Sequence, residues 1–365
     1  HSSGGPAGPD TCSELGRTLG GEPMRLENGS EVVAHYGSEE AEYQALVDAV
    51  GIAVRNWPDL LRVRGEDRKT FLNGKVTCEI EGIEPGGGAY GFFLDAKGHI
   101  QADTVIRVLE DAVWLELPAG RGHRIAEHLS RFIVIDRVEV EPMTDLEPLT
   151  LVGPRVEDLL ESFSGVAPPP ERPWQVGWLA ADHGNRVLVS ADGRWGVPSF
   201  TFWPSACDAE ELLRALLEAG RDHDARLVGY RALDRLRIEA AIPWFGADFG
   251  EANLPQETGQ GEAVSFTKGC YLGQEVVARL HYRGQVQKVL CGVTIEAEGV
   301  PSPGTSIVFE GRKAGMLTSA ARSPRMRTIA GIAMLHRKAA DLGARLELEG
   351  VGRARVSKTP LREEV

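Results

Sequence analysis

Apolar and polar positions in the first part of the chain follow a helical spacing and then a strand spacing. Residues 39–50 place their large apolar side chains on one helical face, and Ser38 stands where a helix cap is expected. Residues 60–64 alternate as in a strand, and the turn after them leads into a short helix that carries Phe71 and Leu72. The pattern predicts mixed helix and strand from the start.

A hairpin pattern follows between Tyr90 and Pro118. Strand-like alternation on both sides of the turn at 95–98 predicts two paired strands, and a third strand is expected before Pro118. Residues 121–132 have helical spacing, and residues 133–141 alternate again like a strand. Helices and strands interleave without the regular alternation of a parallel sheet, so the predicted class is α+β.

The second half contains helices first and short strands afterwards. Asp208 and Glu211 have the spacing of a capping box at the start of a helix that ends at Gly220. Another helix is expected over about 230–240. From Val286 onward, short apolar runs are separated by Gly and Pro turns, a pattern that is typical of a small all-β barrel.

These patterns divide the chain into three stretches. Residues 1–23 are rich in Gly, Pro and Ser and lack apolar periodicity, so they are interpreted as a tag remnant and a loose leader outside the fold. Residues 24–285 are expected to form two α+β subdomains, and residues 286–365 the C-terminal barrel domain. The Pro-rich stretch 166–170 is expected to be a surface connection.

Composition and charge narrow the class of partner. The 365 residues are 42% hydrophobic and 25% charged, which is typical of an ordinary globular protein. Forty Lys and Arg stand against 53 Asp and Glu, and the net charge of −13 argues against direct nucleic-acid binding. No window approaches the ~18 consecutive apolar residues of a membrane span, so no membrane partner is expected.

Cysteine and histidine usage bears on location and metals. The five cysteines are an odd, widely spaced set without a C-x-x-C pair, which favours a reducing compartment, the cytoplasm. Neither the cysteines nor the nine histidines have a metal-ligand spacing, so no metal is expected. No heptad or long apolar stripe indicates an obligate interface, so the protein is expected to be a monomer.

The densest candidate for chemistry is the segment 268–275, Lys-Gly-Cys-Tyr-Leu-Gly-Gln-Glu. Glycines near Cys270 allow the backbone to approach a ligand closely, and Lys268 would favour the thiolate. A helix that begins near Leu272 would lower the pKa of the Cys270 thiol further. The alternative is that Cys270 is a small buried residue in a tight turn.

Two carboxylates are further candidates. Asp103 shares one face of its strand with Arg107 and could position or deprotonate an amine, unless that face is simply solvated. Glu239 ends the helix at 230–240, where the helix dipole disfavours it, so it either faces solvent or has a specific partner. Arg237 is interpreted as a surface ion-pair residue.

The segment 268–275 matches every fixed position of K-G-C-Y-x-G-Q-E, the signature of the YgfZ-type folate-binding proteins. The chain resembles this group over residues 27–362, and the group belongs to the superfamily of the glycine-cleavage T-protein, an aminomethyltransferase. Further segments resemble that superfamily in the same order: an apolar-Gly-Pro step at 149–154, an R-x-x-D-x-L-R-x-E-A helix at 231–240, and C-terminal segments at 315–319 and 329–333.

The resemblance implies a three-domain ring around a central channel that holds tetrahydrofolate or a substituted folate, with one subdomain discontinuous and the β-barrel last. Glu239 falls on the glutamate that hydrogen-bonds the pterin, and Asp103 on the aspartate beside the reacting folate nitrogens. Further candidate folate-binding residues are Lys268, Tyr271, Gln274 and Arg283.

Two functions are consistent with this resemblance. The first is a cytoplasmic tetrahydrofolate-binding accessory factor for iron-sulfur cluster assembly or repair, with Cys270 as a reactive thiol or transient ligand. Its partners would be iron-sulfur clients or assembly proteins, including enzymes that modify tRNA. The alternative is a folate-dependent aminomethyl or methyl transferase, or a demethylase, that uses Asp103. Arg107 and Ala102 replace a tyrosine and an aspartate of T-proteins, which favours the first function. A protein-interaction scaffold is a third hypothesis.

Overall fold

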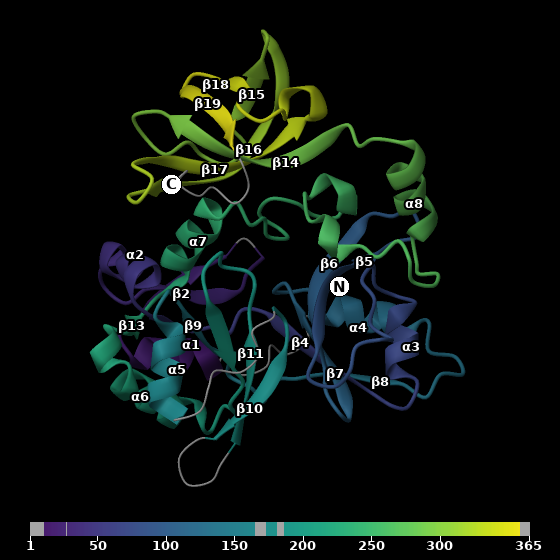
Figure 1. Cartoon of the computed structure of the whole chain (residues 1–365), viewed down its shortest axis with the longest axis vertical. Coiled ribbons are helices and arrows are strands. Elements are labelled where there is room, and N and C mark those ends of the chain that lie inside the picture. Colours follow the sequence, from purple (N-terminus) through teal and green to yellow (C-terminus); the bar gives the residue numbers. More distant parts are fainter. Residues whose placement is uncertain (1–10, 27, 165–172, 181–185, 358–365) are drawn as a thin grey trace, which may run out of the picture.

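The polypeptide folds into two sheet-containing parts and a β-barrel that meet at the middle of the molecule (Figure 1). The structure is a computed structural model and describes residues 11–26, 28–164, 173–180 and 186–357. The barrel occupies one end, and the two sheets lie at the other. The α+β class and the C-terminal barrel are therefore confirmed.

The first sheet has six strands in the order β10-β11-β12-β9-β3-β13. All neighbours are antiparallel except the parallel pair of β13 and β3. The strand β3 comes from before the second sheet in the chain and the others from after it, so this part is discontinuous in sequence. The strands are β3 (Gly51–Val54), β9 (Leu149–Val152), β10 (Val176–Ala180), β11 (Arg186–Ala191), β12 (Ser199–Phe202) and β13 (Arg226–Leu227).

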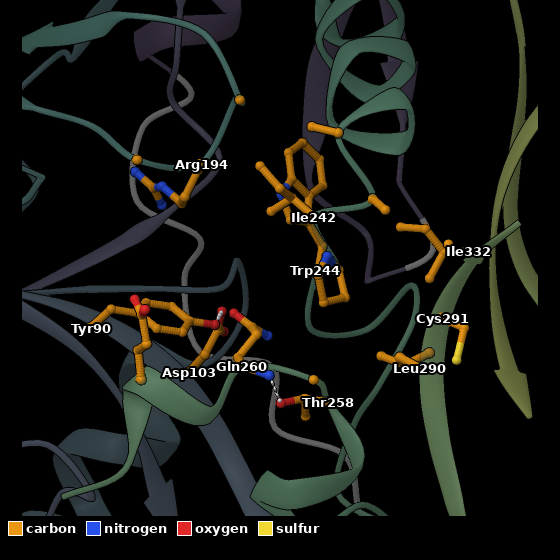
Figure 2. A pocket seen from close by; sticks show the side chains of 18 of the residues that line it. Tyr90, Asp103, Arg194, Ile242, Trp244, Thr258, Gln260, Leu290, Cys291 and Ile332 are labelled. Carbon is orange, nitrogen blue, oxygen red and sulfur yellow. Dashed lines mark hydrogen bonds between the residues drawn. The ribbon is translucent and has the colours of Figure 1, made fainter. Parts of the chain in front are cut away.

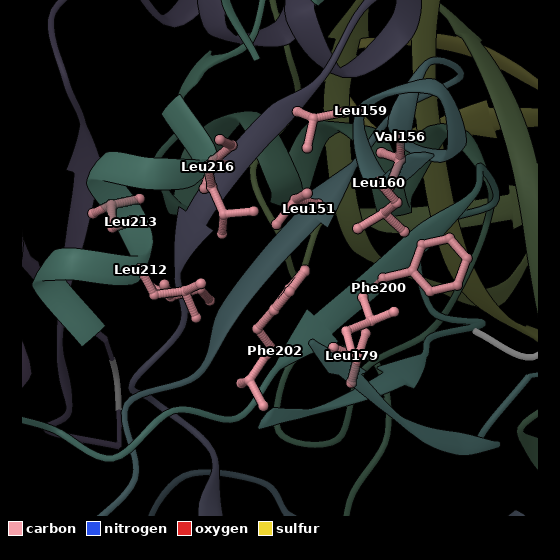
Figure 3. Packing of buried hydrophobic residues seen from close by; sticks show 14 of the residues in the cluster. Leu151, Val156, Leu159, Leu160, Leu179, Phe200, Phe202, Leu212, Leu213 and Leu216 are labelled. Atoms are coloured by element: carbon pink, nitrogen blue, oxygen red, sulfur yellow. The ribbon is translucent and has the colours of Figure 1, made fainter. Parts of the chain in front are cut away.

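Helices cover both faces of this sheet, which is why every residue of its inner strands β3, β9 and β12 is buried. On one face, α5 (Val156–Ser164) and α6 (Ala209–Ala219) pack leucines against Leu151, Phe200 and Phe202 (Figure 3). On the other face, Ala53 and Val152 meet α2 (Glu39–Asp48) and α7 (Tyr230–Glu239).

The second sheet has five antiparallel strands in the order β5-β6-β7-β4-β8, and it confirms the predicted hairpin. Two helices, α3 (Arg68–Asn73) and α4 (Gly122–Ser130), supply core residues beside it. The strands are β4 (Asp59–Arg64), β5 (Gly88–Leu94), β6 (Ile100–Val108), β7 (Ala112–Leu117) and β8 (Glu139–Pro142).

The strand predicted over 133–141 is wrong for most of its length. Only its last residues pair, in β8, and the preceding segment runs as turns and bends. Val134 and Ile135 are 82% and 90% exposed there. Alternation alone predicted a strand, but no partner strand is available to this segment.

Two N-terminal predictions have opposite outcomes. The cap of α2 is confirmed, because the Ser38 hydroxyl accepts a hydrogen bond from the Ala41 amide at 3.2 Å. The loose leader is wrong over residues 11–23, since α1 (Thr11–Thr18) packs Leu15 into the core and β1 (Glu22–Arg25) pairs with β2 (Glu31–His35). Residues 1–10 and the Pro-rich stretch 166–170 lie outside the described residues.

The helix α6 lies where it was predicted, but its start differs. Asp208 makes no side-chain hydrogen bond to the helix amides and instead accepts one from the Ser205 hydroxyl at 2.6 Å. The capping box is therefore absent, while Gly220 does follow the last helical turn.

The barrel closes in the order β14-β17-β16-β15-β18-β19 around Val293, Leu317 and Leu335. The boundary proposed between residues 285 and 286 falls between α8 (Gln274–Arg283) and the first barrel strand. The barrel strands are β14 (Lys288–Glu296), β15 (Ser306–Phe309), β16 (Arg312–Ser323), β17 (Thr328–His336), β18 (Arg345–Leu348) and β19 (Gly352–Ser357).

Within the described residues, no helix combines the length and the apolar character that a membrane crossing requires.

Candidate functional site

Two cavities of about 430 Å³ each meet at the centre of the molecule, and both are lined by Tyr90, Asp103, Arg194 and Trp244. The first cavity extends toward the barrel, where Leu290, Cys291 and Ile332 complete its wall (Figure 2). The second extends past Arg121 and Asn28 and includes the barrel residues Thr318 and Ser319. All three parts of the fold contribute to the walls, so the predicted central channel is present.

Asp103 lies at the junction of the two cavities, on β6. Tyr90, on the neighbouring strand β5, donates a hydrogen bond from its hydroxyl to Asp103 Oδ2 at 2.8 Å. The other oxygen, Oδ1, is buried and has no hydrogen-bond partner among the described residues. Burial raises the pKa of Asp103 to about 6. The simple solvated strand face is therefore wrong, and Oδ1 is a buried acceptor that lacks a partner among the described residues.

A buried cluster of charges lies beside Asp103. Arg194 pairs with both oxygens of Asp192, at 3.0 and 2.7 Å, and its Nη1 lies 2.5 Å from Glu116 Oε1. Glu116 also pairs with Arg55 at 2.7 Å and with Arg107 at 2.9 Å. Three guanidinium groups face two carboxylates, and Asp103 supplies the third negative charge when it is ionised.

Arg107 was expected on the same strand face as Asp103, and it is fully buried. Its guanidinium stacks on the Trp203 ring at 4.5 Å, and burial lowers its pKa to about 10. It lines neither cavity. Its contribution to the site is therefore electrostatic and indirect, through Glu116.

A second buried cluster joins α7 to the barrel and corrects the interpretation of Arg237 as a surface residue. Arg237 is 2% exposed, pairs with Asp234 and Asp248, and donates a hydrogen bond to Ser319 on β16 at 2.9 Å. Asp248 also accepts from Thr318 at 2.6 Å. Because Ser319 and Thr318 line the second cavity, this cluster holds the barrel wall against the rest of the site.

Glu239 has partners within the protein instead of facing solvent. It is fully buried at the end of α7, where the Tyr43 hydroxyl donates to Oε1 at 2.7 Å and Arg325 lies 3.4 Å from Oε2. Both carboxylate oxygens are engaged, and Glu239 lines neither cavity. The structure does not bring it to Asp103.

The segment 268–275 also lies outside the cavities, in the loop that leads into α8. The Lys268 ammonium donates to the backbone oxygens of Val76 and Cys78, at 2.8 and 2.5 Å, and burial lowers its pKa to about 8. Gly273 has a φ of 82°, and a Cβ there would lie 2.6 Å from the Asp95 oxygen. Lys268 therefore anchors this loop to the segment between α3 and β5, and Gly273 packs it against the turn of the first hairpin.

Cys270 is exposed, so the alternative of a buried structural cysteine is wrong. Lys268 points into the protein, so it is not positioned as the thiol's partner. The helix α8 begins at Gln274, close to the expected start. Tyr271 is buried, Arg283 is exposed at the end of α8, and none of the predicted residues of this segment lines either of the two central cavities.

Of the predicted site residues, Asp103 alone lines the central cavities. The residues that sequence reasoning missed are Arg194, Trp244 and Gln260, which line the first cavity. The only sequence signal for Arg194 is a charged residue among closely spaced glycines, Gly193 and Gly196, in a segment between strands. Within the described ranges, no group of three or more His, Cys, Asp and Glu could hold a metal ion.

Comparisons with known proteins agree with this architecture. The GCVT N-terminal domain model matches residues 23–268, and the glycine cleavage T-protein C-terminal barrel domain model matches residues 288–362. The chain therefore belongs to the glycine-cleavage T-protein family. The superfamily predicted from the sequence motifs is confirmed.

Relatives match over nearly the whole chain. An aminomethyltransferase of Anoxybacillus flavithermus is 26% identical over 341 residues, which cover 91% of this chain and 92% of the relative. One of Symbiobacterium thermophilum is 27% identical over 343 residues, 91% of each chain. The solved structure of glycine cleavage system aminomethyltransferase T from Bartonella henselae has a TM-score of 0.87 at 19% identity, covering 97% of this chain and 98% of that one. The fold is shared over 97% of this chain.

Proposed function

We propose that this protein binds tetrahydrofolate, or a substituted folate, in the two joined cavities and transfers a one-carbon unit there with Asp103, as an aminomethyl or methyl transferase or as a demethylase. The observation that carries the proposal is the position of Asp103, at the junction of both cavities with Oδ1 unpartnered among the described residues. The relatives named aminomethyltransferase support this activity over others on the same fold.

The cavities fit a flat heterocycle with a polar edge. Tyr90 and Trp174 stack at 5.8 Å with an interplanar angle of 24°, and Trp244 adds a third aromatic wall. Such rings favour a planar ligand, while the Asp103 carboxylate and the Gln260 amide provide polar contacts. A folate has this combination of a flat heterocycle and N–H groups.

In this proposal the two oxygens of Asp103 have separate roles. Tyr90 occupies Oδ2 and fixes the orientation of the carboxylate, so Oδ1 is left to accept a hydrogen bond from a ligand N–H. With a pKa of about 6, Asp103 is mostly ionised at neutral pH. It can take the proton that an amine nitrogen loses as this nitrogen bonds to the carbon of an aminomethyl donor and the donor's carbon–nitrogen bond breaks, releasing ammonia. The bound folate supplies that nitrogen.

The test is anaerobic calorimetry with tetrahydrofolate, followed by an assay for methylenetetrahydrofolate formed from an aminomethyl donor. Asp103→Asn should abolish turnover and weaken binding. Glu239→Gln is the matched control, because it changes a buried carboxylate of this region that lines neither cavity. Binding that survives Asp103→Asn unchanged but is lost in Glu239→Gln would overturn the assignment.

A second candidate function is the accessory role in iron-sulfur cluster assembly or repair that the YgfZ-type motif implies. The exposure of the Cys270 thiol favours it, because a partner protein can reach it without entering the cavities. Its partners would be iron-sulfur client or assembly proteins. Cys270→Ala should then fail to support a cluster enzyme in cells that lack the endogenous factor.

Cys207→Ala is the matched control for that experiment, since Cys207 is also free and exposed. Full rescue by Cys270→Ala would eliminate the accessory role through this thiol. It would leave folate binding at Asp103 untouched.

A further inference from the structure

Arg194 is held in one orientation at the wall of both cavities. Asp192 pairs bidentately with Nε and Nη2, and Glu116 pairs with Nη1. Asp192 occupies the Nε–Nη2 edge of the guanidinium and Glu116 occupies one N–H of Nη1, so each Nη retains one further N–H. The side chain retains 19% exposure and lines both cavities, so its free edge is available to a ligand.

Aromatic rings flank this edge. The Arg194 guanidinium lies 5.9 Å from the Trp174 ring, which in turn stacks with Tyr90. Figure 2 shows Arg194 and Asp103 reaching the cavity from different elements, with space between them. A flat ligand in that space meets a fixed hydrogen-bond donor at Arg194 and a fixed acceptor at Asp103.

The charges of the site favour a neutral acceptor over an anion. Arg55, Arg107 and Arg194 are balanced by Glu116 and Asp192 together with ionised Asp103. An anionic ligand group would add an unbalanced charge to this buried site, whereas a carbonyl oxygen accepts the hydrogen bond without one.

We propose that Arg194 determines ligand specificity, by selecting a heterocycle that presents a carbonyl oxygen to it and rejecting one that presents an amino group there. The inference rests on the proposed folate site, where the matching group is the 4-oxo oxygen of the pterin ring. An amino group at that position is a hydrogen-bond donor, so it could not accept a hydrogen bond from the Arg194 guanidinium, which is held in one orientation and cannot turn away. A site built around such a hydrogen bond discriminates strongly against an analogue that cannot make it.

The experiment compares tetrahydrofolate with its analogue carrying an amino group in place of the 4-oxo group, by anaerobic calorimetry on the full chain. The unmodified protein should bind tetrahydrofolate at least about tenfold more tightly, the range expected for a hydrogen bond to a charged group. Arg194→Met should bring the ratio of the two affinities close to one. Arg194→Lys, which keeps a charged donor, should retain part of the preference.

Arg107→Met is the matched control, because it removes a cation from the same buried cluster without touching either cavity. The analogue also lacks the ring N–H next to the 4-position, so the comparison of variants isolates the contribution of Arg194. Thermal unfolding of each variant shows whether it is folded, and if Arg194→Met is not, Arg194→Lys decides.

The outcomes separate the two proposals. Equal affinities in the unmodified protein, or a preference that Arg107→Met removes as completely as Arg194→Met, would overturn the role of Arg194 and leave folate binding intact. Absence of tetrahydrofolate binding in the unmodified protein would overturn the proposed function and this inference together.

Discussion

The loop at 268–275 has a contiguous sequence motif but lies outside the central cavities, whereas the residues that line the cavities are scattered along the chain. The loop carries the most specific motif of the chain. Its lysine nevertheless anchors it to the segment before β5, its Gly273 packs against the turn of the first hairpin, and its cysteine is exposed to solvent. The cavity wall has no contiguous motif, yet it gathers Asp103, Arg194 and Trp244 from three separate segments. The position of a contiguous motif in the sequence therefore does not show where the cavity site lies, because tertiary contacts bring the residues of that site together.

The largest expected effect is on stability, and it tests whether the buried arginines near the cavities need the Glu116 carboxylate. Glu116→Gln removes the carboxylate that Arg55, Arg107 and Arg194 share. Arg107 would lose the only carboxylate it pairs with among the described residues, while Arg55 and Arg194 would keep Asp192. The free energy of unfolding should therefore fall by about 3–5 kcal/mol, measured by denaturant titration. A loss below about 1 kcal/mol would show that the cluster is not essential to the fold.

The next effect concerns chemistry at Asp103. Asp103→Asn keeps the size of the side chain but removes the charge, so turnover should fall by about 100-fold or more, the usual contribution of a general base. The change should be measured as kcat/KM for methylenetetrahydrofolate formation. A full-rate variant would assign the chemistry elsewhere in the cavities.

Gly273→Ala should have a smaller effect, on stability, that is confined to the loop. Its φ of 82° and the 2.6 Å approach of the added Cβ to the Asp95 oxygen predict a loss of about 1–3 kcal/mol. Gly269→Ala is the control, since a Cβ there meets no atom within 4 Å. Equal losses in both variants would contradict the anchoring role of Gly273.

The raised pKa of Asp103 predicts how stability and activity at the central cavities depend on pH. Because the pKa of Asp103 is raised to about 6 in the folded chain, the folded state binds its proton more tightly than the unfolded state. Its contribution to stability therefore falls as pH rises from about 4 to about 6, and Asp103→Asn should remove that slope. Activity should rise with pH over the same range, since the ionised carboxylate is the base. A pH profile of kcat/KM that is unchanged by Asp103→Asn would refute this.

The smallest effect is expected at Cys270. Because the thiol is exposed, Cys270→Ala should change the free energy of unfolding by less than about 0.5 kcal/mol and leave tetrahydrofolate binding unchanged. A larger loss of stability would mean that Cys270 is part of the anchor. With a neutral result, any loss of cellular function in this variant can be assigned to the thiol itself.

Capping residues and turn residues predicted helices and strands correctly where the tertiary packing favoured the same structure. Ser38 caps α2, and the Gly and Pro turns after Val286 do separate barrel strands. The failures at 133–141 and Asp208 share one cause. Alternation and capping patterns describe what a segment could do, whereas strand partners and competing side chains such as Ser205 decide the outcome.

The sequence by itself determined the α+β class, the terminal barrel and the superfamily, because these depend on periodicity and on short motifs that survive in one dimension. It also singled out Asp103 through its strand. Only the tertiary structure decided that Arg107 and Arg237 are buried, that Glu239 is occupied by Tyr43, and that Arg194 faces the cavities. The physical reason is that burying a charge is favourable only with partners, and here those partners come from segments far apart in the chain.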